Sequence, residues 1–120
     1  MTNGTTTPLG THGESIAAEW LTEHGYEVLE RNWRCARGEI DVIAWDGDTL
    51  VFIEVKTRAG CSTGHPFEAI TDAKVARLRR LVPAWFAEHP DVGARSIRID
   101  AVAVHIDGPR NVVEHVAGIQ

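Results

Sequence analysis

Hydrophobic and polar residues alternate along two neighbouring stretches of the chain, Glu39 to Trp45 and Leu50 to Lys56. Such alternation places successive side chains on opposite faces of a strand. The sequence Asp46-Gly47-Asp48 lies between them, and aspartate followed by glycine between alternating runs is typical of a tight hairpin. The pattern therefore predicts a β-hairpin within Gly38 to Arg58, around which the rest of the chain is organised.

Apolar residues at helical spacing predict one helix before this hairpin and one after it. The first begins at Thr11 or Gly13 and stops at Gly25, a residue type that often follows the last helical turn. The second has Thr71 as its N-cap. Pro83 lies within the second helical pattern and is expected to kink the helix or to end its regular part.

Three further segments are predicted to be extended. Tyr26 to Trp33 leads into the hairpin, and Ile97 to Ile106 is apolar on both faces, which is typical of a central strand. Asn111 to Val116 is predicted to form a last edge strand. The order α-β-β-β-α-β-β predicts an α/β protein with a mixed β-sheet flanked by helices. Residues 1–10 are predicted to be a flexible tail, and residues 11–120 a single domain.

The composition agrees with one folded domain, since 43% of the 120 residues are hydrophobic. No apolar run approaches the roughly 18 residues of a membrane helix. The N-terminus has neither the basic start nor the apolar centre of a signal sequence. Cys35 and Cys61 do not form a disulfide framework and are expected to be reduced thiols. We therefore expect a cytoplasmic protein with no membrane association.

The net charge of −5 is unfavourable for nucleic-acid binding, but the charges are unevenly distributed. Residues 31–80 hold nine of the twelve lysines and arginines and seven of the seventeen acids, a net charge of +2. Three of those acids are Glu39, Asp41 and Glu54, on the predicted hairpin. The middle of the chain is thus expected to present a basic face around an acidic cluster, although a solvated mixed surface remains an alternative.

The hairpin gathers carboxylates on one face in either of two registers. If residues 47 and 48 form the loop, Asp41 lies opposite Glu54; if residues 46 and 47 form it, Glu39 takes that place and Asp41 is the diagonal neighbour. Carboxylates that face one another on a sheet repel, and apolar neighbours deprive them of hydration. A bound divalent cation relieves both effects, and oxygen ligands suit Mg²⁺ or Mn²⁺.

Lys56 lies two residues beyond Glu54, so the two side chains share a face of the strand. A lysine there can orient a water molecule or stabilise charge that develops on a phosphate. A purely structural carboxylate–lysine network is the alternative. The combination of Asp41 with Glu54 and Lys56 at hairpin spacing favours the metal site.

Asp41 followed by Glu54-Val55-Lys56 resembles the PD-(D/E)xK nuclease motif, except that Ile40 replaces the proline of the motif's name. Three stretches closely resemble the YraN-like family of small bacterial proteins: Arg31-Asn32-Trp33-Arg34, Gly38-Glu39-Ile40-Asp41, and Val51 to Arg58. The resemblance covers roughly Gly10 to Asp107. It implies a restriction-endonuclease-like fold related to Holliday-junction resolvases, in a family whose cellular role is poorly defined.

Two further site residues rest on this resemblance. Related nucleases carry an acid of the first helix in the metal site, and Glu14 matches that position. Taken alone, Glu14 also suits the dipole of the helix in its first turn. Lys74 matches a lysine that faces the site in the YraN-like pattern, while its structural alternative is a side-chain stem that covers the edge of the core. Candidate nucleic-acid contacts are Arg34, Arg37, Arg58, Lys74, Arg77 and Arg80.

These observations predict a Mg²⁺- or Mn²⁺-dependent endonuclease that hydrolyses DNA, with branched DNA as one candidate substrate. Asp41, Glu54 and Glu14 would hold the metal, and Lys56 would assist the attacking water. Two alternatives stay open: a nucleic-acid-binding module with little or no cleavage activity, and a protein-interaction domain whose acids form internal ion pairs. Many junction resolvases are dimers, so a homodimer is an assembly suggested by analogy only.

Overall fold

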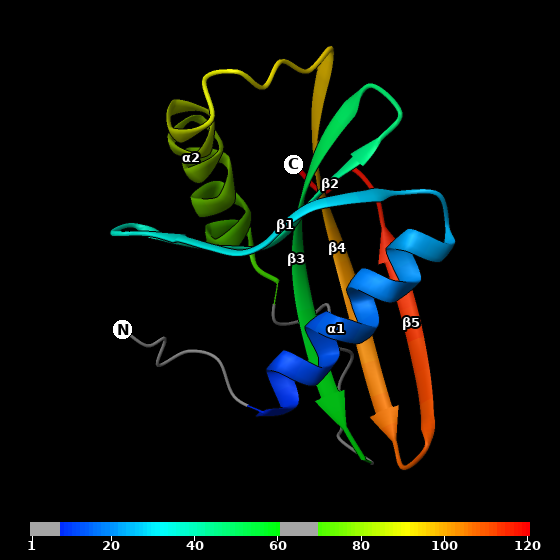
Figure 1. Ribbon diagram of the computed structural model, residues 1–120. Helices are drawn as coiled ribbons and strands as arrows, with labels where there is room; N and C mark the ends of the chain where they lie inside the picture. The colour runs from blue at the N-terminus through cyan, green and yellow to red at the C-terminus, as the bar shows by residue number, and fades with distance from the viewer. Residues whose placement is uncertain (1–7, 61–69) are drawn as a thin grey trace.

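The computed structural model describes residues 8–60 and 70–120. The helices and strands in these residues are α1 (Pro8–Glu23), β1 (Glu27–Cys35), β2 (Gly38–Asp46), β3 (Thr49–Ala59), α2 (Asp72–Glu88), β4 (Ser96–Asp107) and β5 (Arg110–Val116). Their order is α-β-β-β-α-β-β, so the predicted mixed α/β class is confirmed (Figure 1).

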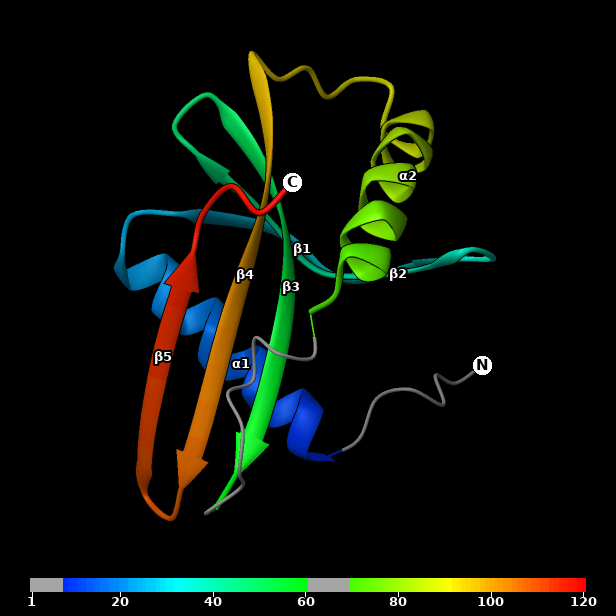
Figure 2. The same cartoon turned by 180° about the vertical axis from the view of Figure 1, so that it is seen from behind.

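The five strands form one sheet in the order β1-β2-β3-β4-β5. Every neighbouring pair is antiparallel except β3 and β4, which run parallel. A parallel pair needs a crossover connection, and α2 lies in the segment that joins these two strands. The first helix crosses one face of the sheet and α2 packs on the other, as the two opposite views show (Figures 1 and 2).

Each helix buries one hydrophobic core against the sheet. The α1 core contains Ala17, Leu21, Val42, Ala44, Val51, Ile53, Val55, Val102 and Val104. The α2 core contains Trp33, Ile40, Ile43, Leu50, Phe52, Leu78, Leu81, Val82, Trp85 and Ile99. Successive residues of the central strand β3 enter opposite cores, as the period of two for a strand requires. The sheet is therefore covered on both faces where β2 and β3 run.

The hairpin of β2 and β3 adopts the first of the two registers considered from the sequence. Asp46 pairs with Thr49, and the pairing continues as far as Val42 with Ile53. Gly47 has φ +61°, which a two-residue hairpin loop requires at its first position and which glycine adopts without steric cost. One further step in this register brings Asp41 to the level of Glu54.

On the N-terminal side of Val42, β2 separates from β3. Here β1 and β2 continue together as an arm that leaves the sheet and passes below α2 (Figure 1). Residues two apart on a strand normally share a face. Here Val42 packs in the α1 core and Ile40 in the α2 core. Strict alternation along β2 predicts that Ile40 and Ile43 lie on different faces of the sheet. This prediction is wrong, because β2 rotates at Asp41 and both residues pack in the α2 core.

The same rotation occurs on the partner strand. Arg31 hydrogen-bonds Ser15 of α1, whereas Trp33 is buried in the α2 core. Asn32 lies between them with φ +55°, and among the described residues it is the one non-glycine residue with positive φ. Because Arg31 pairs with Val42 and Trp33 with Ile40, Asn32 is level with Asp41 at the point of rotation.

The helix boundaries differ from the prediction at one end. The first helix begins at Pro8, not at Thr11 or Gly13, because proline is well suited to the first helical position. Residues 8–10 of the predicted tail are thus helical, and residues 1–7 lie outside the described part of the chain. The N-cap at Thr71 is confirmed: its hydroxyl accepts a hydrogen bond of 3.3 Å from the N–H of Lys74. The helix α2 continues past Pro83 to Glu88.

No helix within residues 8–60 and 70–120 is long and apolar enough to cross a membrane.

Candidate metal and nucleic-acid site

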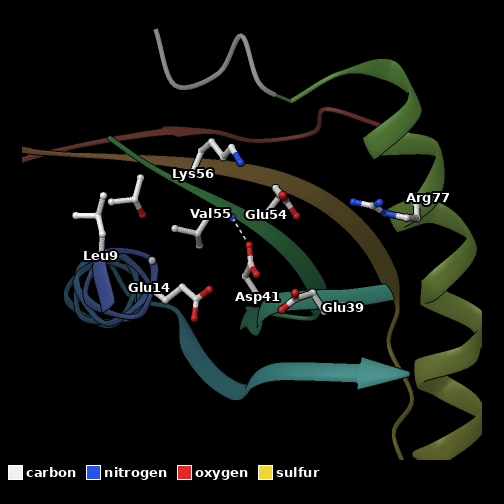
Figure 3. A pocket seen from close by; sticks show the side chains of 10 residues that line it. Leu9, Glu14, Glu39, Asp41, Glu54, Val55, Lys56 and Arg77 are labelled. Atoms are coloured by element: carbon white, nitrogen blue, oxygen red, sulfur yellow. Dashed lines mark hydrogen bonds between the residues drawn. The ribbon is translucent and has the colours of Figure 1, made fainter. Parts of the chain in front are cut away.

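A cavity of about 300 Å³ opens where β2 separates from β3, between the beginning of α1 and α2 (Figure 3). Its charged lining residues are Glu14 from α1, Glu39 and Asp41 from β2, Glu54 and Lys56 from β3, and Arg77 from α2. Glu14 extends toward Asp41, whose carboxylate points to the N–H of Val55, while Lys56 and Arg77 extend toward Glu54 (Figure 3). The fold therefore brings the four predicted catalytic residues together in one cavity.

Asp41 is buried, with 7% of its surface exposed. Its Oδ2 accepts a hydrogen bond of 2.8 Å from the N–H of Val55. Burial raises the pKa of Asp41 well above its ordinary value, and the neighbouring charge of Glu54 raises the pKa further, while the hydrogen bond from Val55 opposes the rise. A carboxylate in this position gains free energy from any positive charge that enters the cavity.

Glu54 faces the same cavity from β3 and experiences the opposite balance of neighbours. Burial raises the pKa of Glu54, while the positive charges of Lys56, Lys74 and Arg77 lower it. The pKa of Glu54 is raised overall, so the three cations do not fully offset the removal of its carboxylate from water. Lys56 and Arg77 also line the cavity, and the predicted basic surface of α2 therefore reaches the acidic cluster.

Glu14 comes close to this cluster because α1 packs unusually tightly against β3. A Cβ atom added to Gly13 would lie 1.9 Å from Oγ1 of Thr57, so only glycine permits this approach. Glu14 is 8% exposed. Burial, followed by the charge of Glu39, raises the pKa of Glu14, and a hydrogen bond from the side chain of Asn32 opposes the rise. Its Oε1 is buried and has no hydrogen-bond partner within residues 8–60 and 70–120.

Another buried carboxylate, outside the cavity, has its charge fully compensated by hydrogen bonds. Asp100 of β4 is fully buried and accepts hydrogen bonds from Arg98, from His115 and from the N–H of Gly118, at 2.7–3.0 Å. Although burial favours its neutral form, these bonds hold the pKa of Asp100 below its ordinary value. Asp41, by contrast, accepts the hydrogen bond from the N–H of Val55 and still has a raised pKa.

The residues of the cavity suit a hard divalent cation. In the part of the chain that the structure describes, no group of three or more His, Cys, Asp and Glu side chains is placed so that it could hold a metal ion. Mg²⁺ does not require such a group, since it is usually held by one or two carboxylates and keeps several waters. Asp41 and Glu54 supply two carboxylates, and the unpartnered Oε1 of Glu14 offers a third oxygen.

The predicted nucleic-acid contacts divide into two groups. Arg77 lines the cavity, and Lys74 lies close enough to Lys56 and Glu54 for their charges to affect its pKa, which burial lowers. The others lie outside the cavity lining. They are Arg34, 3.8 Å from the carboxylate of Glu39; Arg37, exposed in the turn of the arm; Arg58, near the end of β3; and Arg80, exposed on α2.

Three residues that shape the site were not predicted from the sequence. Gly13 and Thr57 set the spacing of α1 and β3, and Asn32 contacts Glu14. The glycine next to Glu14 was a usable signal, because a glycine inside a helix is unfavourable unless close packing requires it. The role of Asn32 depends on a positive φ within a strand, which no periodic pattern reveals.

Comparison with known proteins places this chain in a family. The profile described as "Uncharacterised protein family UPF0102" matches residues 13–104. A UPF0102 protein of Beutenbergia cavernae is 54% identical over 112 residues, which cover 92% of this chain and 94% of that protein.

Two further relatives give the same result. A UPF0102 protein of Kineococcus radiotolerans is 53% identical over 113 residues, with 92% of each chain covered. A UPF0102 protein of an Arthrobacter species is 50% identical over 114 residues, which cover 92% of this chain and 94% of that protein. The YraN-like resemblance is confirmed, and the chain belongs to the uncharacterised protein family UPF0102.

Proposed function

We propose that this protein is a metal-dependent nuclease that hydrolyses phosphodiester bonds of DNA. The observation that carries the proposal is the convergence of Glu14, Asp41, Glu54 and Lys56, from two strands and a helix, on one cavity. Carboxylates with raised pKa values beside a lysine in a cleft are typical of functional sites. The match to the PD-(D/E)xK motif supports the same reaction.

Asp41 and Glu54 would hold Mg²⁺ or Mn²⁺, and Glu14 would complete the acidic cluster. When bound, such a cation polarises the phosphate and lowers the pKa of a coordinated water. Lys56 lies on the same face as Glu54, where its ammonium can orient the attacking water and stabilise negative charge that develops on the phosphate. A lysine suits this task because it carries a compact charge on a flexible stem.

Basic side chains on α2 would bind the phosphates of DNA beside the acidic cluster. Lys74 and Arg77 stand on the α2 side of the cavity, opposite Glu14 on α1. One wall of the cavity is thus basic and the other acidic, so the DNA backbone is expected to follow α2 and the arm. Branched DNA, a cytoplasmic location and a homodimer belong to the same proposal, and they rest on the family resemblance.

A nucleic-acid-binding module with little cleavage activity is the second candidate. Lys74 and Arg77 beside the cavity support it, because basic side chains bind phosphates whether or not the DNA is then cut. The net charge of −5 is unfavourable for nucleic-acid binding in both candidates. The two candidates differ in one respect only: the nuclease must turn over DNA when supplied with a divalent cation.

The deciding experiment incubates the protein with single-stranded, flapped and four-way-junction DNA in Mg²⁺ or Mn²⁺, with EDTA as a blank. The test variant carries Asp41→Ala and Glu54→Ala. The control variant carries Glu19→Ala and Glu23→Ala, which remove two exposed carboxylates from α1 outside the cavity lining. Both variants change the net charge equally, so a general charge effect would alter them alike.

For a nuclease, wild type and control cut at least one substrate in a reaction that EDTA abolishes, and the test variant does not. Calorimetry with Mn²⁺ gives a second measurement on the same three proteins, and binding should be absent only in the test variant. Failure of the wild type to cut any substrate, together with DNA binding, would favour the binding module. Equal Mn²⁺ binding by all three proteins would exclude this metal site.

A further inference from the structure

Asn32 occupies an unusual place in the middle of β1. Its φ of +55° lies in the left-handed region, and the strand pairs regularly on either side, through Arg31 with Val42 and Trp33 with Ile40. Asn32 is therefore level with Asp41 across the pair, at the point where the two strands rotate. A left-handed residue inside a strand is strained, and such residues cluster at functional sites.

The side chain of Asn32 reaches the acidic cluster. Its side chain lies close enough to the carboxylate of Glu14 on α1 to lower the pKa of that carboxylate, so Asn32 connects β1 to the helix beside the cavity. Its Oδ1 and Oε1 of Glu14 are both buried, and neither atom has a hydrogen-bond partner among the residues that the structure describes. Two unpartnered acceptors on neighbouring side chains are costly unless a donor or a cation satisfies them.

A backbone role alone does not explain this arrangement. Asparagine tolerates left-handed φ better than other non-glycine residues, so the turn of the strand is one reason for asparagine at this position. That explanation would leave the amide free to face water. Instead the amide is turned inward against a carboxylate that is itself 8% exposed.

The geometry points to Asn32 as a positioning residue, which holds the carboxylate of Glu14 in the orientation that a divalent cation in the cavity requires. This inference rests on the proposed function, because it assumes that Glu14 faces a bound cation. The amide N–H fixes one oxygen of Glu14 and leaves Oε1 available to the cation or its waters. Partners that orient metal ligands in this way are typically worth about 10–100-fold in metal affinity.

The test uses Asn32→Gly, because glycine adopts the required φ without strain and removes only the amide. The matched control is Asn111→Gly on β5, an exposed asparagine whose φ is not positive. Calorimetry with Mn²⁺ and thermal unfolding are measured for both variants and wild type. Asn32→Gly is then repeated in a Glu14→Gln background, which completes a double-mutant cycle.

We expect Asn32→Gly to keep or raise the unfolding temperature, and to weaken Mn²⁺ binding by about 10-fold or more. Asn111→Gly should leave the affinity unchanged. In the Glu14→Gln background, Asn32→Gly should have little further effect, since its action passes through Glu14. Wild-type affinity in Asn32→Gly, or a full effect that persists without Glu14, would overturn the inference alone. Absence of Mn²⁺ binding by wild type would instead remove the proposed function and this role with it.

Discussion

The carboxylate of Asp41 accepts a hydrogen bond from the backbone N–H of Val55 at 2.8 Å. The ladder between β2 and β3 ends at Val42 and Ile53, so this N–H would otherwise be buried without a partner as the strands separate. The side chain of Asp41 takes the place of the missing backbone acceptor. Asp41 therefore supplies the hydrogen-bond acceptor where β2 separates from β3, and it also lines the cavity. The same side chain contributes to the fold and to the candidate site.

This double role gives Asp41 a pH-dependent effect on stability. Its pKa is raised well above the ordinary 3.8 in the folded protein. At pH values between the unfolded and the folded pKa, the folded state therefore binds more protons than the unfolded state. The contribution of protonated Asp41 to the free energy of unfolding is complete below the unfolded pKa and is lost as pH rises through the folded pKa. In EDTA, Asp41→Asn should therefore raise the unfolding temperature at pH 7, because it removes the buried charge and keeps an acceptor for Val55.

The stabilising effect of Asp41→Asn should disappear near pH 4, where wild-type Asp41 is already protonated in the folded state. Asp41→Ala is the informative comparison, since it removes both the charge and the acceptor. Leaving the N–H of Val55 unsatisfied costs about 1–3 kcal/mol, so the alanine variant should be less stable than the asparagine variant by that amount. Equal stability of the two variants in urea titrations would show that the hydrogen bond contributes nothing.

The close contact of Gly13 with Thr57 leads to a second prediction. Gly13→Ala would place a methyl group 1.9 Å from Oγ1 of Thr57, and α1 must move away from β3. Overpacking of this kind costs about 1–3 kcal/mol, although alanine is the better helix former. Chemical denaturation should show this loss, together with weaker Mn²⁺ binding because Glu14 moves with the helix.

Gly93→Ala provides the control for this substitution, because an added Cβ meets no atom within 4 Å there. Its stability should stay within about 0.5 kcal/mol of wild type, as for most surface substitutions. If Gly13→Ala proves as stable as Gly93→Ala, the contact between α1 and β3 is looser than described and does not position Glu14.

Much of this fold follows from local patterns in the sequence. The two helices, the hairpin and the strand over residues 97–106 were predicted because each repeats its period over several residues. The hairpin register was narrowed to two choices, and the pairing of Asp46 with Thr49 in the structure decides between them. Aspartate-glycine pairs allow the loop to begin at either residue, so sequence alone could not make that choice.

The predictions that rest on the two-residue period of a strand are wrong where β1 and β2 depart from that period. The rotation of β1 and β2 at Asn32 and Asp41 puts Ile40 and Ile43 into one core, although strict alternation separates them. A single left-handed residue leaves no trace in the hydrophobic pattern. Asp41, Glu54 and Lys56 could nevertheless be proposed as site residues because they form a recognisable motif, and all three line the cavity. Asn32 and Thr57 belong to no such motif and lie near residues of distant segments.

The basic surface of α2 yields a third prediction, which concerns DNA binding. Arg77 lines the cavity and Arg80 is exposed on the same helix. Replacing both with glutamate should weaken DNA binding. The slope of log affinity against log salt should also become shallower, by about 0.9 for each phosphate of duplex DNA that the variant no longer neutralises. Fluorescence anisotropy over a range of salt concentrations measures both effects.

Arg110→Glu is the control for this surface, since Arg110 is exposed at the start of β5 and outside the cavity lining. It should lower affinity slightly through net charge and leave the salt slope unchanged. A slope that is the same in wild type and in the Arg77→Glu, Arg80→Glu variant would show that DNA does not contact α2.

The last prediction separates a catalytic Lys56 from a structural one. Lys56→Met keeps the apolar stem and removes the charge that opposes the rise in the pKa of Glu54. If the ammonium acts on the phosphate or the attacking water, the variant should fold, bind DNA and bind Mn²⁺ nearly as wild type does. Its cleavage rate should fall roughly 100- to 1,000-fold, the usual effect of losing one charge-stabilising group.

A structural Lys56 would produce the reverse pattern. Its loss would leave Glu54 with Lys74 and Arg77 as its remaining cationic neighbours, so Lys56→Met would lower the unfolding temperature and leave the rate per folded molecule intact. Circular dichroism and single-turnover cleavage of the best substrate, measured on the same preparation, distinguish the two cases. A folded Lys56→Met variant that cuts at the wild-type rate would refute the catalytic assignment, because no other change was made to the charge beside the acidic cluster.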